Sequence, residues 1–422
     1  MTKHYSFTLN IIACLIWSIV IHAQEPGEWN QLGGPNRNFH IESVPLAKDW
    51  PTDGPRRLWS RLLGEGYSSI VVDGGMLFTM YRDGDTEIVV ALNAGTGNTL
   101  WHHASTAPLE HNGYVDIWLN AAGPGPYSTP LVVNDSVFAV GIEGRFDALD
   151  KQTGNLLWSL DLVEQFNLSE YNAFASSPLA FGGTVILPLG GSAQGVVAFE
   201  QDTGSVLWRS SAFSVAPGSP LLINVDGQDQ IVVVGQQALV GLDPASGRHL
   251  WRHPHENELG LNISMPVWGE DNRLFASSAY NGGSQMVHLS QIDGRTTPDE
   301  QWSTNRMRVH FSNALRLGTT ILGSSGDFGP AFLTALDAET GQEQWRDRAF
   351  ARAHMLYADE KLVIVDEDGD VAIASISNQG LQIHARQSVM SANSWTPPTL
   401  VDGILFVRDR KEIVAFDLRR QE

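Results

Sequence analysis

The segment Ala148-Leu-Asp-Lys-Gln-Thr-Gly-Asn-Leu-Leu-Trp158 decides the fold, because closely related segments return along the chain. In each complete copy a glycine stands six places after the first small residue, and a tryptophan stands four places after that glycine. Five copies keep this register: residues 91–101, 148–158, 198–208, 241–251 and 335–345. Two further copies are degenerate, since residues 288–302 carry four extra residues before the tryptophan and residues 374–384 end in His384. A recurring unit of this kind indicates a repeat architecture.

The repeated unit has the composition of four short strands and a turn. β-Branched and aromatic runs such as 137–140 and 231–234 precede the copies, as is typical of strands. Asp-x-x-Thr-Gly is turn chemistry, because the polar side chains bond nearby backbone and glycine accepts a positive φ. About 40–50 residues with four strands is typical of a propeller blade. We therefore predict an all-β propeller in which large indoles fill the space between neighbouring blades. The blade-packing residues are Trp59, Trp101, Trp158, Trp208, Trp251, Trp302 and Trp345.

The two ends of the repeat array complete each other. A last copy starts at Ala415, and Glu422 follows before any tryptophan strand. The missing strand matches residues 57–61, which contain Trp59. We therefore predict a single eight-bladed β-propeller over residues 55–422, with four-stranded blades and the last blade closed by an N-terminal strand. Such closure removes an open sheet edge.

The innermost strands share a short polar signature, of which Tyr127-Ser-Thr-Pro130 is one example. Its second position is small in six blades and is occupied by His354 and Trp395 in two adjacent ones. We expect these two side chains and His310 to line one side of a central funnel, with Tyr67 and Tyr127 beyond the closure, as a site for a ligand or partner. The alternative is that they only plug the crowded axis.

The net charge and the N-terminal segment limit the possible partners and locations of the protein. Acidic residues outnumber basic ones 47 to 27, giving a net charge of −20, which disfavours nucleic acid and anionic lipid as main partners. Residues 1–23 have the polar start, apolar run and small residue at Ala23 of a signal peptide, with a retained anchor as the alternative. Residues 24–54 form an extended lead-in. The only cysteine, Cys14, lies too early for a lipidation site, so we expect an exported, periplasmic or secreted chain without lipid anchor, disulfide or transmembrane segment.

The Ala-x-Asp-x-x-Thr-Gly-x-x-x-Trp units resemble the pyrroloquinoline quinone (PQQ)-like propeller repeats, a family that includes quinoprotein alcohol dehydrogenases and BamB-type outer-membrane assembly factors. The segment Trp29-Asn-Gln-Leu-Gly-Gly-Pro-Asn-Arg37 is similar to the lead-in of bacterial exported proteins with these repeats. The dehydrogenase resemblance implies a quinone, a Ca²⁺ ion and a catalytic carboxylate, and in alcohol-oxidising families an adjacent cysteine pair. Since the predicted mature chain has no cysteine, we expect no cofactor, with PQQ and Ca²⁺ as the alternative.

Other groups of polar residues favour structural interpretations. Residues 366–370 resemble a Ca²⁺ loop but lack the glycine and glutamate that an EF-hand requires at its sixth and twelfth positions, so we predict a hairpin turn. His253 and His255 are expected in an exposed loop and not in a metal site.

We therefore predict no catalytic or metal-binding residues, and a monomeric, non-catalytic scaffold or binding protein of the BamB-like type. It would present its loops to an envelope protein or peptide. The alternatives are a PQQ-dependent alcohol dehydrogenase-like enzyme and a propeller that binds a glycan or small molecule.

Overall fold

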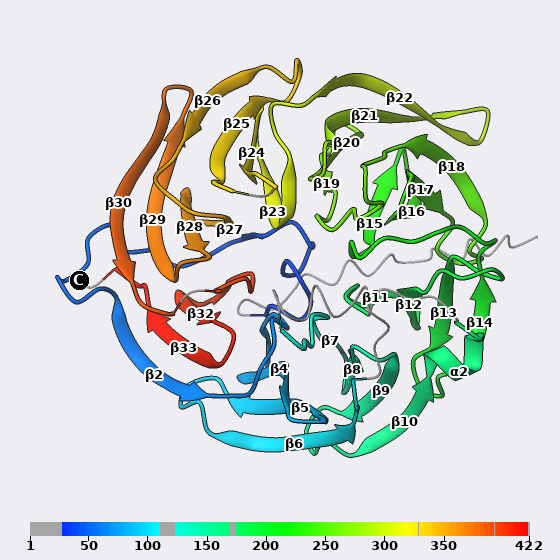
Figure 1. Cartoon of the computed structure of the whole chain (residues 1–422), viewed down its shortest axis with the longest axis horizontal. Helices are drawn as coiled ribbons and strands as arrows, with labels where there is room; N and C mark the ends of the chain where they lie inside the picture. The colour runs from blue at the N-terminus through cyan, green and yellow to red at the C-terminus, as the bar shows by residue number, and fades with distance from the viewer. Residues whose placement is uncertain (1–27, 110–122, 169–173, 328, 392, 421–422) are drawn as a thin grey trace, which may run out of the picture.

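The computed structural model describes residues 28–109, 123–168, 174–327, 329–391 and 393–420. These residues form eight sheets arranged as the blades of a ring, which confirms the predicted eight-bladed propeller (Figure 1). The predicted signal peptide and Cys14 lie outside the described residues. None of the helices in the described part of the chain is long and apolar enough to span a bilayer.

Each blade runs outward from its first strand, which faces the channel at the centre of the ring. Blade 1 contains β3 (Val71–Asp73), β4 (Met76–Asp83), β5 (Thr86–Asn93) and β6 (Thr99–Thr106). Blade 2 contains β7 (Leu131–Val133), β8 (Ser136–Val140), β9 (Arg145–Asp150) and β10 (Leu156–Asp161), and the short helix α2 (Leu162–Phe166) follows it. Blade 3 contains β11 (Leu179–Phe181), β12 (Thr184–Pro188), β13 (Val196–Glu200) and β14 (Val206–Arg209). Blade 4 contains β15 (Leu221–Val225), β16 (Gln228–Val234), β17 (Ala238–Leu242) and β18 (His249–Pro254).

The second half of the ring follows the same order. Blade 5 contains β19 (Val267–Trp268), β20 (Arg273–Ser278), β21 (Gly283–Ile292) and β22 (Arg295–Thr304). Blade 6 contains β23 (Val309–Leu317), β24 (Thr320–Ser325), β25 (Phe332–Asp337) and β26 (Glu343–Asp347). Blade 7 contains β27 (Ala353–Ala358), β28 (Lys361–Asp366), β29 (Asp370–Ser377) and β30 (Gly380–Ser388). Blade 8 contains β31 (Thr399–Val401), β32 (Ile404–Arg408), β33 (Glu412–Asp417) and, from the other end of the chain, β2 (Arg56–Leu62).

The ring closes between the two ends of the chain, as predicted. Strand β2 pairs antiparallel with β33, and Trp59 lies opposite Ala415 in the register. The fully buried Arg408 then ties blade 8 to blade 1, since its Nη1 donates to the carbonyl oxygens of Ser68 and Met80. The pairing with β2 covers the outer edge of β33, which would otherwise be an unpaired strand edge.

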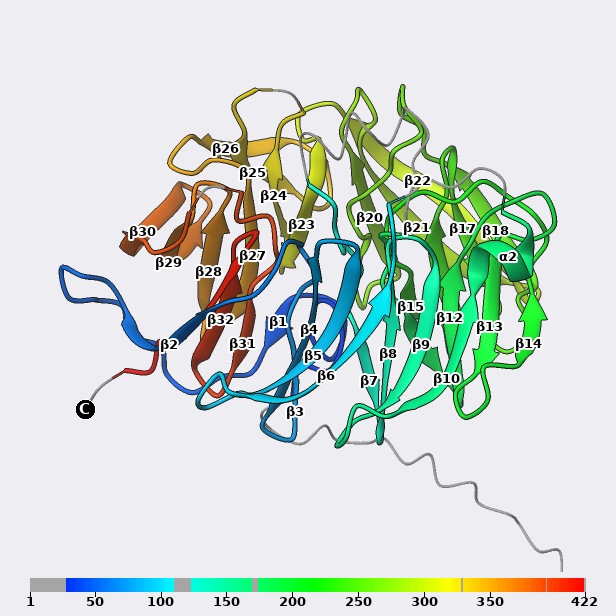
Figure 2. The ribbon, with the colours of Figure 1, turned by 60° about the horizontal axis from the view of Figure 1, so that its bottom comes forward.

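The lead-in occupies the ring and is not a detached extension (Figures 1 and 2). Trp29, which is fully buried, exchanges two backbone hydrogen bonds with Val72 at the end of β3. Arg37 donates from Nη1 to the carbonyl oxygen of Pro178 in blade 3. Strand β1 (His40–Ile41) then pairs in parallel with the end of β27, giving blade 7 a fifth strand. The lead-in therefore bridges blades 1, 3 and 7 along their inner strands.

The repeat motif is an interlock between neighbouring blades. The Trp101 indole N–H donates to the carbonyl oxygen of Lys151 in blade 2, and Gly154 packs against the Trp101 ring. Asp150 stabilises the turn by accepting the backbone N–H of Thr153. Equivalent contacts join Trp59 to Gly97, Trp158 to Gly204, Trp208 to Gly247 and Trp302 to Gly341. The aspartate, glycine and tryptophan recur together because one blade provides the turn and its neighbour provides the ring.

Trp251 departs from this interlock. Gly294, the corresponding glycine of blade 5, contacts nothing within 4 Å of its Cβ position, because β21 and β22 are ten residues each and carry the turn away from Trp251. Instead, the Trp251 indole donates to Gln230 Oε1, and Gln230 Nε2 donates to Thr296 Oγ1 of blade 5. A buried polar relay thus replaces the glycine contact. Trp345 keeps a bond to blade 7 through the carbonyl oxygen of Ser377.

A glycine substitution can measure the interlock. Gly154 has φ +71°, and an added Cβ would lie 2.5 Å from the Trp101 ring. We expect Gly154→Ala to lower the free energy of unfolding by about 2–4 kcal/mol, since it combines left-handed strain with overpacking. The control is Gly294→Ala, which has φ +73° and open space around it and should cost about 1 kcal/mol from strain alone. Equal losses in denaturant unfolding would show that the tryptophan contact contributes nothing.

Candidate functional site

The upper face of the ring, defined as the face on which the inner strands begin, is held together by hydroxyl groups. Ser69, Thr129 and Ser177 each donate a backbone N–H to a side-chain hydroxyl of the next blade, accepted by Thr129, Ser177 and Ser219 in turn. Ser69 Oγ donates to the carbonyl oxygen of Pro397 and continues the series into blade 8. The polar signature of the inner strands is therefore a set of bonds between blades, a role that sequence reasoning missed.

The five predicted funnel residues lie together on this face. The Tyr67 and Tyr127 rings stack with centroids 6.1 Å apart, and Tyr67 lies 5.3 Å from Trp395. Phe311 extends the contact, with its ring 5.0 Å from Trp395, 5.0 Å from His310 and 6.2 Å from His354. We call these six side chains the aromatic arc. Tyr67, His310 and His354 are buried, whereas Tyr127, Phe311 and Trp395 are half-buried. The arc lies on blades 6, 7, 8, 1 and 2.

The arc is neutral at its centre and charged at its edge. Burial lowers the pKa of His310 to about 4, and the Arg352 charge adds to the shift. Burial also lowers the pKa of His354 to about 4, although the nearby Trp395 backbone opposes the shift. Glu367 accepts hydrogen bonds from Trp395 Nε1 and Arg352 Nη1, each 3.0 Å long. Burial raises the pKa of Tyr67 to about 12. Its buried hydroxyl has no hydrogen-bond partner among the described residues.

The two histidines predict an acid-sensitive fold. Because the native pKa of about 4 lies below the ordinary value of 6.5, the unfolded chain binds protons that the native protein does not as the pH falls between these values. Stability is therefore complete above pH 6.5 and declines toward pH 4, by up to about 1.4 kcal/mol per pH unit for each histidine. In urea titrations at several pH values between 4 and 6.5, His354→Gln should make the free energy of unfolding less dependent on pH, because the contribution of one histidine is removed. His102→Gln, at an exposed position of β6, is the control, and an unchanged slope for His354→Gln would contradict the assignment.

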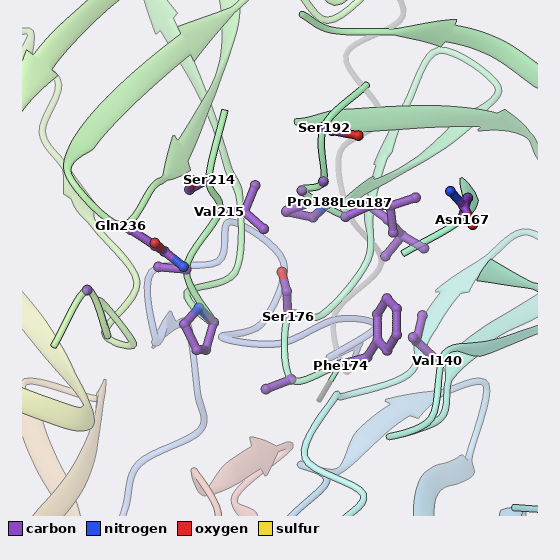
Figure 3. A pocket seen from close by; sticks show the side chains of 17 residues that line it. Val140, Asn167, Phe174, Ser176, Leu187, Pro188, Ser192, Ser214, Val215 and Gln236 are labelled. Atoms are coloured by element: carbon purple, nitrogen blue, oxygen red, sulfur yellow. The ribbon is translucent and has the colours of Figure 1, made fainter. Parts of the chain in front are cut away.

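A pocket of about 510 Å³ lies beside the arc, between blades 2, 3 and 4. None of its lining residues is charged, although the chain carries −20 overall. Figure 3 shows Phe174 beside Val140 on one wall and Ser214 and Gln236 on the opposite one, with Ser176 between them. We call this the upper pocket. Sequence reasoning missed it, although Gly190-Gly191, shortly after the buried strand β12, marks one wall.

Local backbone pairing shapes the upper pocket. Ala216 donates its backbone N–H to Val234, and Gln236 donates its backbone N–H to Ser214, so the link between blades 3 and 4 is fixed as a wall. On the other side Gly190 has φ +69°, and an added Cβ would lie 3.0 Å from a Val215 methyl group. Gly190 and Val215 are therefore closely packed, and the two sides of the pocket that they belong to are held in a defined frame.

The remaining polar groups do not form a metal centre. In the portions of the chain that the structure describes, no three His, Cys, Asp or Glu side chains come together as a metal would require. Residues 366–370 form the turn between β28 and β29, with Asp366 Oδ1 accepting the backbone N–H groups of Asp368 and Asp370. His253 and His255 correct an expectation, because neither lies in an exposed loop: His253 is half-buried in β18, and His255 is buried and bonded to Ser278 Oγ.

The described residues also do not fit a Ca²⁺–quinone pair. Ca²⁺ needs six to eight oxygen ligands, several of them carboxylates. Glu367, beside Trp395, is already engaged by Trp395 and Arg352, and Glu65, near Tyr67, is engaged by Arg410 and Lys411. The neutral histidines of the arc offer ring nitrogens, which Ca²⁺ does not prefer. No chemical step through such a cofactor follows from this arrangement.

Comparisons with known proteins agree with the fold. The chain is 27% identical over 308 residues to the quinohemoprotein alcohol dehydrogenase ADH-IIG of Pseudomonas putida, a match that covers 67% of this chain but only 40% of that enzyme. It is 23% identical over 323 residues to the outer membrane protein assembly factor BamB of Yersinia pestis, covering 69% of this chain and 75% of that protein. The crystal structure of BamB from Moraxella catarrhalis superimposes with a TM-score of 0.63 at 16% identity, covering 86% of this chain and 99% of that one.

The family model described as outer membrane protein assembly factor BamB matches residues 51–195 and 192–422. These two matches cover nearly the whole propeller, including the closing strand β2 and all eight blades. The chain therefore belongs to the family described as outer membrane protein assembly factor BamB.

Proposed function

We propose that the protein is an exported, non-catalytic scaffold of the cell envelope whose upper face binds a peptide segment of a protein partner. The observation that carries the proposal is the upper pocket, an uncharged recess on a strongly acidic protein. Membership of a family described by outer membrane protein assembly supports an envelope role. The lead-in and the closed ring supply the rigid frame that a scaffold needs.

The chemistry of the upper pocket suits a neutral peptide segment. Leu187, Val215 and Phe174 provide apolar surface, while Ser176 and Gln236 provide hydroxyl and amide groups. A peptide backbone needs both kinds of contact, because its side chains gain from burial and its N–H and C=O groups need partners. A charged ligand would find no counter-charge there. The upper pocket therefore favours a short, uncharged stretch of chain.

The aromatic arc gives the same face a second contact area. Trp395, Phe311 and Tyr127 are half-buried, so parts of their surfaces remain available to a partner. Partly exposed tryptophan and tyrosine side chains contribute strongly to protein interfaces, because they offer a large apolar area with a polar tip. We therefore assign the arc to the partner interface beside the upper pocket.

The test is capture of partners from envelope extracts with the full chain and two variants. Ser214→Trp places a large ring at the exposed rim of the upper pocket, and should remove a specific partner. Ser303→Trp makes the same exchange at an exposed position of β22, and should leave that partner bound. Retention of every partner by Ser214→Trp would contradict binding at the upper pocket.

A quinone experiment tests the non-catalytic part of the proposal, because several relatives are quinone-dependent alcohol dehydrogenases. PQQ and Ca²⁺ are added to the purified protein, and absorbance change and dye reduction with alcohols are recorded. The proposal predicts neither saturable PQQ binding nor alcohol-dependent dye reduction. Stoichiometric PQQ binding together with alcohol-dependent dye reduction would contradict the scaffold proposal and favour an oxidoreductase.

A further inference from the structure

A second recess on the upper face has the opposite character from the upper pocket, because arginines surround it. It encloses about 360 Å³ above blade 6. Its walls are the link between β22 and β23, the end of β24, the start of β25 and the end of β26. Three arginines and one carboxylate line it: Arg306, Arg308, Arg346 and Asp327. We call it the arginine pocket.

The guanidinium groups are clustered around a shared apolar support. Arg346 and Arg348 both lie over the Phe332 ring, at 5.2 and 4.8 Å from its centroid. Arg346 Nη2 also donates to the carbonyl oxygen of Arg306, at 3.0 Å, which brings these two residues together. Stacking on an aromatic ring holds a guanidinium in place while leaving its N–H edge available.

The positive charges of the arginine pocket exceed the nearby negative ones. Arg308 pairs with Asp327 at 3.1 Å, and Arg346 pairs with Glu343 at 2.7 Å. Arg306 and Arg348 are exposed and form no ion pair with any carboxylate in the described ranges. The unpaired guanidinium groups of Arg306 and Arg348 repel those of Arg308 and Arg346 unless an anion lies between them. This excess stands out on a protein whose overall charge is −20.

Asp327 adds a second, independent feature. Its Oδ2 faces Arg308, but its Oδ1 is buried and has no hydrogen-bond partner among the described residues. A buried carboxylate oxygen without a donor is costly. A hydroxyl group of a bound molecule would satisfy it, whereas a fully deprotonated simple anion would not.

We propose that the arginine pocket binds a phosphate monoester, with Arg306 and Arg346 beside the phosphate oxygens, Arg348 adding positive charge from the Phe332 ring at the pocket's edge, and Asp327 accepting a hydrogen bond from a hydroxyl of the phosphate or its carrier. Guanidinium groups match phosphate geometry with paired N–H donors. The carrier is either a lipid headgroup or a soluble molecule. The negative net charge disfavours anionic lipid as a main partner of the whole protein. It does not determine what a single positively charged pocket binds. This site is separate from the proposed partner site.

The experiment titrates the full chain with inorganic phosphate by calorimetry and, in a second arm, with phosphatidylcholine vesicles containing phosphatidic acid. The variant Arg306→Gln/Arg348→Gln should weaken binding about tenfold or more, since two charge-assisted contacts are lost. The control Arg248→Gln/Arg252→Gln removes the same charge from exposed positions of blade 4 and should stay within about twofold of the wild type, because screening weakens distant charges.

The two arms distinguish the carriers. Binding of inorganic phosphate with or without vesicle binding supports a soluble or shared source, and binding of the vesicles alone supports a lipid headgroup. Binding in neither arm, equal weakening by both double variants, or binding of a polyglutamate peptide without phosphate would overturn the proposal. The single variant Arg348→Gln, which removes one exposed guanidinium stacked on Phe332, provides the same comparison if the double variant does not fold.

Discussion

Trp101→Ala is expected to lower the free energy of unfolding by about 3–5 kcal/mol, the usual cost of truncating a large buried aromatic side chain. Trp101 is 8% exposed, and its indole N–H donates to Lys151 of the next blade. Its ring also contacts Phe78 within its own blade, at 5.8 Å between centroids. Loss of the indole would therefore leave a cavity at a joint between two blades. Denaturant unfolding monitored by circular dichroism measures the loss.

The matched control is Leu157→Ala on β10, where the side chain is 51% exposed. Surface truncations of this kind usually change stability by no more than about 0.5 kcal/mol. If Trp101→Ala costs less than about 1 kcal/mol under the same conditions, the interlock does not stabilise the ring as argued here.

Trp29→Ala is expected to have a similarly large effect, about 3–5 kcal/mol, although Trp29 lies outside the repeats. The indole is fully buried, and the chain turns over it at Gly34, whose Cβ position would be 3.1 Å from the ring. Truncation should loosen the lead-in from blade 1 and raise its susceptibility to proteases. Unfolding curves and limited proteolysis measure the two effects.

Trp50 provides the comparison within the lead-in. It is only half-buried, so Trp50→Ala removes less buried surface and should cost clearly less than Trp29→Ala. Equal costs for the two variants, or a protease pattern unchanged by Trp29→Ala, would mean that the lead-in does not anchor through its first tryptophan.

The repeat made most of the fold predictable, because each copy carries its own packing partner. The aspartate and glycine that form one turn are also the surface on which the previous tryptophan rests, as Asp150, Gly154 and Trp101 show. The same residues therefore form the turn within one blade and the contact with its neighbour, so a single sequence motif predicts both. Trp251 shows where this prediction fails, because four extra residues place Gly294 away from the indole and Gln230 makes the contact instead.

Features outside the repeat could not be predicted, because nothing in the chain signals their partners. Trp29 and Arg37 belong to a segment without periodicity, and their contacts in blades 1 and 3 depend on the finished ring. The upper pocket arises from small residues at links between blades, where the absence of bulk has no distinctive pattern. The residues of the aromatic arc were easier to predict from the sequence, because His354 and Trp395 interrupt a regular series of small residues. Their binding role remains a prediction.

The most direct test of the proposed function is photo-crosslinking from the rim of the upper pocket in the cells that produce the protein. A photoreactive amino acid replaces Ser192, which is exposed and lines the pocket, and in a parallel strain replaces Gln342, which is exposed on the outer turn of blade 6. Crosslinked products are identified by mass spectrometry. The scaffold account predicts a specific envelope protein joined through one short, uncharged segment at Ser192 and absent at Gln342. The same products from both positions, or none at Ser192, would contradict it.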